Sequence, residues 1–145
     1  MAPTERMLEL RFPSRPDRLK VVRAAVRCAA QCRGAGDEDT DRMVLAVNEA
    51  CMNVIQHAYG DARIGDVIVE ILAGPAELVF RVLDFAEPVD PECCKGRDLD
   101  DLRPGGLGVH FIREVMDSAG FVQAPEGVGN VFQMTKKMMG PRLVP

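Results

Sequence analysis

Aromatic residues and long apolar runs are both scarce in this sequence. The 145-residue chain has no tryptophan, one tyrosine and six phenylalanines, so its core must rest on Val, Leu, Ile, Met and Ala. No stretch approaches the roughly 18 consecutive apolar residues that a transmembrane helix needs. Near the N-terminus, Glu5, Glu9 and Arg11 stand where a secretory signal peptide would be apolar. We therefore expect a cytoplasmic protein without a membrane span.

Basic residues are also in deficit. Lys and Arg number 18 against 22 Asp and Glu, which gives a formal net charge of −4. A nucleic-acid-binding protein normally carries a basic patch, so we expect no direct nucleic-acid partner. The five cysteines are odd in number and irregularly spaced, which argues against a disulfide framework. Cys28 and Cys32 could share a helix face, but the further ligands of a metal site are missing.

The chain is long enough for one domain, residues 1–145, with its own hydrophobic core. Alternating and helical patterns of apolar residues predict the order β-α-α-β-β-loop-α-β-β. This order predicts an α+β two-layer sandwich, in which three helices cover one face of a mixed, mainly antiparallel sheet. The expected strands are 7–12, 67–72, 78–83, 121–122 and 131–134, and the expected helices begin near 19, 37 and 107 and end near 33, 59 and 116.

The second predicted helix, 37–59, carries a column of polar residues. Glu49, Asn53 and His57 are spaced i, i+4, i+8 and lie apart from the apolar stripe of the same helix. Ala46 and Ala50 flank this column and would let a ligand approach the helix closely. A carboxylate and an amide one turn apart suit a divalent cation and an attacking hydroxyl. From spacing alone, a solvated helix face is the more ordinary interpretation.

Two other segments carry candidate binding residues. Asp84 ends an apolar strand, where it could accept a hydrogen bond from a nucleobase amino group or simply begin a turn. Gly105, Gly106 and Gly108 precede the third helix, where converging N–H groups could contact phosphate oxygens. The pattern is neither a P-loop nor a dinucleotide-binding fingerprint. Between the two segments lies a long irregular connection, which is more often functional than idle.

Taken in order, these segments resemble the GHKL ATPases, and specifically the RsbW-like anti-sigma factor serine/threonine kinases. The run EACMNVIQHAY at 49–59 matches that family's N-box, E-A-x-x-N-x-x-x-H-A-Y. The run DFAEPVDP at 84–91 is similar to its first glycine box, and GGLGVHFI at 105–112 to its second. The resemblance extends over a core of about 8–137. It implies the two-layer ATPase fold of the GHKL (Bergerat) type, within a single histidine-kinase-like ATPase domain.

The resemblance also implies a role for each matching residue. Glu49 would be the general base or a group that orients water. Asn53 would hold Mg²⁺, and Asp84 would accept a hydrogen bond from the adenine amino group. His57 would either contact the nucleotide or orient the helix end. Ala86 stands where the family has a glycine, and its methyl group would crowd the adenine.

The second glycine box would contribute the rest of the nucleotide site. The resemblance implies that the run 105–108 borders the phosphates, through Gly105, Gly106, Leu107 and Gly108. Residues 91–104 would form a lid over the nucleotide. His110, in the following helix, is expected to be a surface residue instead.

The function that the resemblance implies is ATP- and Mg²⁺-dependent phosphorylation of a serine or threonine on a STAS-type anti-sigma factor antagonist. A sigma factor would be the alternative partner, so that the chain would regulate transcription by partner switching. By analogy the chain would form a homodimer. Two other possibilities stay open: a nucleotide-binding module that sequesters its partner without kinase activity, and an interaction domain that no longer binds ATP.

Overall fold

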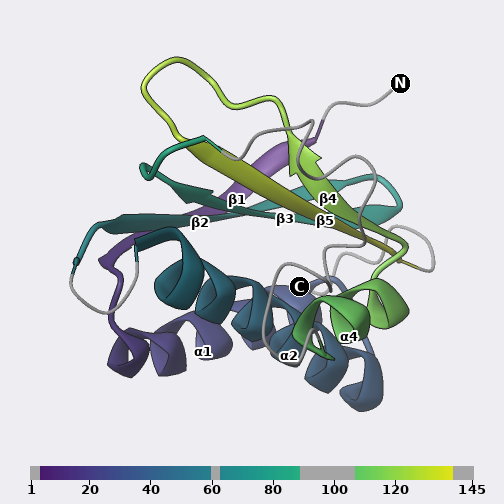
Figure 1. Ribbon diagram of the computed structural model, residues 1–145. Helices are drawn as coiled ribbons and strands as arrows, with labels where there is room; N and C mark the ends of the chain where they lie inside the picture. Colours follow the sequence, from purple (N-terminus) through teal and green to yellow (C-terminus); the bar gives the residue numbers. More distant parts are fainter. Residues whose placement is uncertain (1–3, 60–62, 89–106, 139–145) are drawn as a thin grey trace.

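The computed structural model describes residues 4–59, 63–88 and 107–138. A layer of helices lies against one face of a five-stranded sheet (Figure 1). The strands are β1 (Glu5–Pro13), β2 (Asp66–Gly74), β3 (Glu77–Asp84), β4 (Ser118–Val122) and β5 (Asn130–Lys137). The helices are a 3₁₀ turn η1 (Pro16–Arg18), α1 (Leu19–Cys32), α2 (Asp37–Asn53), a π-helical segment η2 (Val54–Tyr59) and α4 (Leu107–Val115).

The sheet has the strand order β1-β2-β3-β5-β4, and all its pairings among the described residues are antiparallel. This confirms the predicted α+β sandwich with three helices, α1, α2 and α4, on one face. The parallel pairing that a mixed sheet would contain is not seen within the described ranges. The reason is the position of β5. Strands β3 and β4 run in the same direction, but β5 lies between them in the sheet. The two strands of equal direction therefore never pair.

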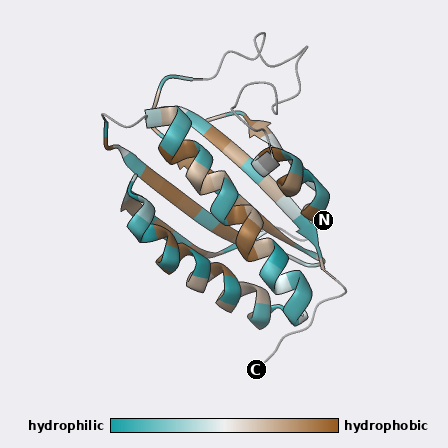
Figure 2. Ribbon diagram, turned by 60° about the horizontal axis from the view of Figure 1, so that its bottom comes forward, coloured by the Kyte–Doolittle hydropathy of each residue, from teal (hydrophilic) through white to brown (hydrophobic). Residues whose placement is uncertain are grey.

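The core lies between the two layers because side chains alternate along each strand. In β3, Leu78, Phe80 and Val82 point toward the helices and are fully buried. In β2, Val67, Val69 and Ile71 do the same, and α1 and α2 supply Val22, Val26, Met43 and Val47 from the other side. Figure 2 looks onto the helix layer and shows hydrophilic outer surfaces on the helices, with hydrophobic segments on the strands behind them.

The predicted helix 37–59 is present, but it is not one regular α-helix. It is α-helical to Asn53 and continues as the π-helical segment η2. A π-turn is wider than an α-turn and often occurs at functional sites. The side chains of His57 and its neighbours therefore point in directions that differ from those in a regular α-helix with i, i+4 spacing. The expectation that Ala46 leaves room for a ligand is wrong, because Ala46 is completely buried in the core.

Two further sequence expectations concern membrane spans and cysteines. None of the helices within the described residues is both long and apolar enough to cross a membrane. Cys28 and Cys32 are exposed, whereas Cys51 is buried, and burial raises the pKa of its thiol to about 12. In the described part of the chain, no three His, Cys, Asp or Glu side chains are grouped to bind a metal ion.

Candidate functional site

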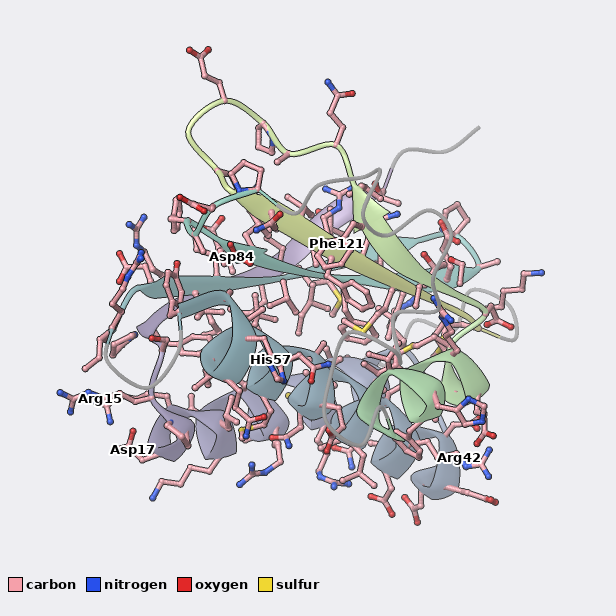
Figure 3. The ribbon with its side chains drawn as sticks, viewed as in Figure 1. Arg15, Asp17, Arg42, His57, Asp84 and Phe121 are labelled. Carbon is pink, nitrogen blue, oxygen red and sulfur yellow. The ribbon has the colours of Figure 1, made fainter. Side chains whose placement is uncertain are left out.

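A cavity of about 450 Å³ opens between the sheet and the C-terminal end of the α2–η2 helix. Three of the predicted site residues, Asn53, His57 and Asp84, line it together. Figure 3 shows Asp84 on the sheet and His57 on the helix layer, on facing sides of this space. The other lining residues come from both layers and from the segment after β3: Ala50, Val54, Ala58, Arg63, Glu87, Pro88, Phe121, Asn130 and Phe132.

Asp84 is the last residue of β3, and its side chain is almost completely buried in the cavity wall. Its Oδ1 accepts hydrogen bonds from the Ala86 N–H and from the Asn130 amide nitrogen, each at 3.0 Å. Burial raises the pKa of Asp84, while these two hydrogen bonds act in the opposite direction. The cavity wall therefore carries a fixed hydrogen-bond acceptor, oriented by two donors.

Asn130 positions Asp84 and was missed as a site residue by the sequence reasoning. It is the first residue of β5 and pairs directly with Asp84 across the sheet. Its Nδ2 also donates to the Glu87 carbonyl at 3.0 Å, so one amide holds both the strand end and the segment after it. The only sequence signal was the Gly129-Asn130 pair at the start of the last strand.

Gly129 explains how closely the last strand approaches the segment after β3. A Cβ atom on Gly129 would lie 2.0 Å from the Ala86 carbonyl oxygen, which no side chain can tolerate. The Gly129 N–H donates to the Asp84 carbonyl at 2.8 Å and fixes this approach. Ala86 is buried beneath it and is not among the cavity-lining residues. No described residue other than glycine has a positive φ, so Ala86 adopts an ordinary backbone conformation.

Tyr59, the last residue of the N-box match, joins three elements at the edge of the cavity. Its hydroxyl donates to the Asp66 carbonyl at 2.6 Å and accepts from the Phe85 N–H at 2.7 Å. Its ring lies so close to Gly65 that a Cβ atom there would be only 2.3 Å away. Partial burial is the main cause that raises the pKa of Tyr59, so the hydroxyl stays protonated and can donate. The N-box tyrosine is thus the residue that ties the helix end to β2 and β3.

Glu49 does not line this cavity but borders a second, smaller hollow of about 300 Å³, together with Leu45, Gly108 and Phe111. A Cβ atom on Gly108 would lie 2.7 Å from Glu49 Oε2, so the carboxylate lies directly against the glycine backbone. Residues from the N-box and from the second glycine box are thereby brought together. The hollow lies one helical turn of α2 away from Asn53.

The remaining predicted residues precede α4 or belong to it. Leu107 begins α4. Gly105, Gly106 and the expected lid, 91–104, lie outside the described residues. His110 is exposed beside Glu114, with its Nε2 3.2 Å from the carboxylate, which confirms the prediction of a surface residue.

An aromatic wall and a charged rim complete the larger cavity. Phe121 and Phe132 meet edge to face, with ring centroids 5.3 Å apart and an interplanar angle of 75°. Arg63 and Glu87 add charges of both signs at the lining. A flat apolar wall with a few fixed polar groups suits a planar heteroaromatic ligand. Phe121 and Arg63 were not predicted as cavity-lining residues, because neither belongs to a recognisable motif.

Comparison with known proteins places these features in a family. The model of the histidine kinase-like ATPase domain matches residues 12–136. The chain belongs to this ATPase family. Serine-protein kinase RsbW of Bacillus velezensis is 31% identical over 145 residues, covering 94% of this chain and 88% of that protein. The RsbW of Bacillus subtilis is 28% identical, covering 94% of this chain and 88% of that protein. The chain is therefore an RsbW-like member of the family.

Solved structures agree with this assignment at the level of the fold. The RsbU and RsbW domains of Rv1364c from Mycobacterium tuberculosis match with a TM-score of 0.61 and 18% identity, over 99% of this chain and 34% of that longer one. The SiaB–SiaC complex from Pseudomonas aeruginosa matches with a TM-score of 0.59 and 17% identity, over 92% of this chain and 91% of that one. Membership of an ATPase family implies that the chain binds ATP.

Proposed function

We propose that the chain is an anti-sigma regulatory factor that phosphorylates a serine or threonine of a STAS-domain antagonist, with ATP and Mg²⁺. The observation that carries this proposal is the position of Glu49. Its carboxylate lies against Gly108, one helical turn from Asn53, which lines the larger cavity. A carboxylate one helical turn from a residue that lines a possible nucleotide cavity could accept the proton of an attacking hydroxyl during phosphoryl transfer.

The larger cavity fits the adenine end of ATP. The Asp84 carboxylate would accept a hydrogen bond from the exocyclic amino group, and Phe121 would lie against the ring. Because Asn130 and the Ala86 N–H already orient Asp84, its acceptor is preorganised for one edge of the base. His57 lines the same cavity and either contacts the nucleotide or supports the end of η2.

The phosphate end would lie toward Asn53, Glu49 and the start of α4. Asn53 offers an amide oxygen to Mg²⁺, whose other ligands would be phosphate oxygens and water, as is common for this ion. Bound Mg·ATP supplies the phosphoryl group and neutralises charge as it is transferred. Gly108, with Gly105, Gly106 and Leu107 before it, would border the phosphates at the N-terminal end of α4.

The role of Glu49 is to take the proton of the attacking hydroxyl. The serine oxygen forms a bond to the γ-phosphorus as the bond to the β,γ-bridging oxygen breaks, and the products are a phosphoserine and ADP. The proton of the hydroxyl passes to the Glu49 carboxylate and then to solvent. A positioned base of this kind contributes about 10²- to 10⁴-fold in rate.

The proposed partners follow from the relatives. The similar proteins bear the name serine-protein kinase RsbW, which supports a protein substrate with a serine acceptor. The antagonist would be the substrate, and a sigma factor would be the alternative partner of a homodimer in the cytoplasm. No direct nucleic-acid contact is expected from a chain of net charge −4.

One observation favours a second candidate function. Glu49 borders the smaller hollow and is not among the residues that line the larger cavity. A chain in which Glu49 stays apart from the phosphates would bind nucleotide and sequester its partner without phosphorylating it.

The test is incubation with Mg²⁺, γ-labelled ATP and STAS-domain proteins from the same genome. The proposal predicts label on a serine or threonine of one of them, located by mass spectrometry. Binding of ATP and of a sigma factor without any transfer would support the second candidate instead.

A further inference from the structure

We propose that the hollow between Leu45 and Phe111 receives an apolar side chain of the substrate from within two positions of the phosphoacceptor serine. This inference rests on the proposed kinase function and adds to it a determinant of substrate choice. The hollow, of about 300 Å³, is bordered by Leu45 and Glu49 on α2 and by Gly108 and Phe111 on α4.

Leu45 is the first observation in support. It lies one turn before Glu49 on α2, so the two side chains are neighbours on the same helix surface. Its side chain is 51% exposed, although its neighbours Val44 and Ala46 are buried in the core. A leucine at this place adds nothing to the core of the chain, but it gives the hollow an apolar wall beside the carboxylate.

The two residues from α4 complete the shape. Phe111 packs partly against the core and supplies the facing apolar wall. Gly108 keeps the base of the hollow open, because any Cβ atom there would press on the Glu49 carboxylate. Glu49 is the only ionisable side chain among the described residues that border the hollow.

Geometry identifies the occupant. A hydroxyl that gives its proton to Glu49 must lie within about 2.6–3.2 Å of the carboxylate. Adjacent residues of an extended segment are about 3.8 Å apart between Cα atoms, so a residue within two positions of that serine can reach Leu45 or Phe111, which border the same hollow as Glu49. An apolar neighbour would bury both walls, whereas an acidic one would face the charge of Glu49. The hollow therefore favours a substrate with an apolar residue within two positions of the serine.

Kinetics of the Leu45→Ala variant provide the test, with a STAS-domain protein that the wild-type chain phosphorylates. We expect the KM for this protein to rise about tenfold, as for loss of one buried apolar contact. The kcat and the affinity for Mg·ATP should stay within about twofold of the wild type. The matched control is Val122→Ala, since Val122 is 41% exposed on β4 and borders neither the cavity nor the hollow.

A second arm varies the substrate. Replacing its apolar neighbour of the serine by alanine should raise the KM for the wild-type chain and have little further effect on the Leu45→Ala variant. An unchanged KM in Leu45→Ala would overturn the proposal, and so would a change confined to ATP affinity, which would mean that nucleotide fills the hollow. Absence of any phosphoryl transfer by the wild-type chain would overturn the proposed function as well. This outcome differs from a failure of the present proposal alone, because it is seen with the wild-type chain before any variant is made.

Discussion

Asp84 and Asn130 face each other across β3 and β5, and the Asn130 amide donates a 3.0 Å hydrogen bond to the Asp84 carboxylate. The same amide donates to the Glu87 carbonyl, so a single side chain holds both the acceptor and the segment beyond it. An acceptor fixed in this way loses little freedom when a ligand binds. The proposed adenine contact therefore depends on a residue outside the recognised motifs.

Replacing Asp84 by asparagine should weaken ATP binding by about ten- to 150-fold. The physical reason is the loss of a hydrogen bond to a charged acceptor, which contributes about 1.5–3 kcal/mol. Calorimetric titration with Mg·ATP measures the effect. The matched control is Asp117→Asn, because the Asp117 carboxylate accepts from the Lys137 N–H at an exposed position away from the cavity. Equal affinities in the two variants would remove Asp84 from the nucleotide site.

The affinity for ATP should also depend on pH through Asp84. Its pKa is raised, mainly by burial, so the acceptor becomes protonated at a higher pH than an ordinary aspartate does. We expect ATP affinity to fall as the pH drops through this raised pKa. Stability should change in the opposite direction, because the folded state binds the proton more tightly than the unfolded state. The contribution of Asp84 to stability is thus full below its unfolded pKa and is lost as the pH rises through the folded one.

Asp84→Asn separates these two effects. The variant should lose the part of the pH dependence of unfolding that Asp84 contributes, as measured by urea titrations at several pH values. At neutral pH it should be no less stable than the wild-type chain, although it binds ATP poorly. A large loss of stability at neutral pH would show that the charge of Asp84 supports the fold and not the ligand.

Gly129→Ala should destabilise the fold by about 1–3 kcal/mol, the usual range for an overpacked site. The added methyl group would meet the Ala86 carbonyl, and neither can rotate away, because the carbonyl belongs to the backbone and a Cβ atom is fixed directly to it. The control is Gly120→Ala in β4, where nothing lies within 4 Å of the new Cβ atom. Chemical denaturation compares the two, and equal stabilities would contradict the close approach of these segments.

The positions of the helices and strands could be predicted from the sequence because each has a local signature. Glycines and prolines mark the turns, and the periodicity of apolar residues separates strands from helices. The match at 49–59 likewise predicted a candidate binding helix, and two of its residues, Asn53 and His57, line the larger cavity. Asn130 could not be assigned a role in the same way, because its partnership with Asp84 depends on the register between β3 and β5, which are distant in sequence.

Three other features could not be predicted from the sequence, because they also depend on tertiary contacts. The π-helical turn η2 ends at Tyr59, whose hydroxyl is held by groups from β2 and β3. The burial of Ala46 reflects the packing of α2 on the core, which helical spacing alone does not reveal. The substitution of alanine for the family glycine at 86 suggested a crowded nucleotide site, yet Ala86 is buried and is not among the residues that line the cavity.

Gly108→Ala should reduce phosphoryl transfer more than it reduces ATP affinity. A methyl group at this position would lie 2.7 Å from the Glu49 carboxylate. The carboxylate would have to move away from the position that it occupies beside Gly108. We expect a fall in kcat of at least tenfold, in line with the cost of misplacing a catalytic group. The control, Gly36→Ala at the start of α2, has open space around the new Cβ atom. A drop in kcat of equal size in both variants would contradict the proposed contact.

The Glu49→Gln variant tests most directly whether Glu49 acts as the base beside bound nucleotide. The measurement is the single-turnover rate of phosphoryl transfer with saturating Mg·ATP and the unphosphorylated STAS-domain partner. The substitution keeps the size of the side chain and removes its ability to take a proton. We expect a rate about 10²- to 10⁴-fold below that of the wild-type chain, with the ATP dissociation constant unchanged. Transfer at the wild-type rate would contradict this role of Glu49.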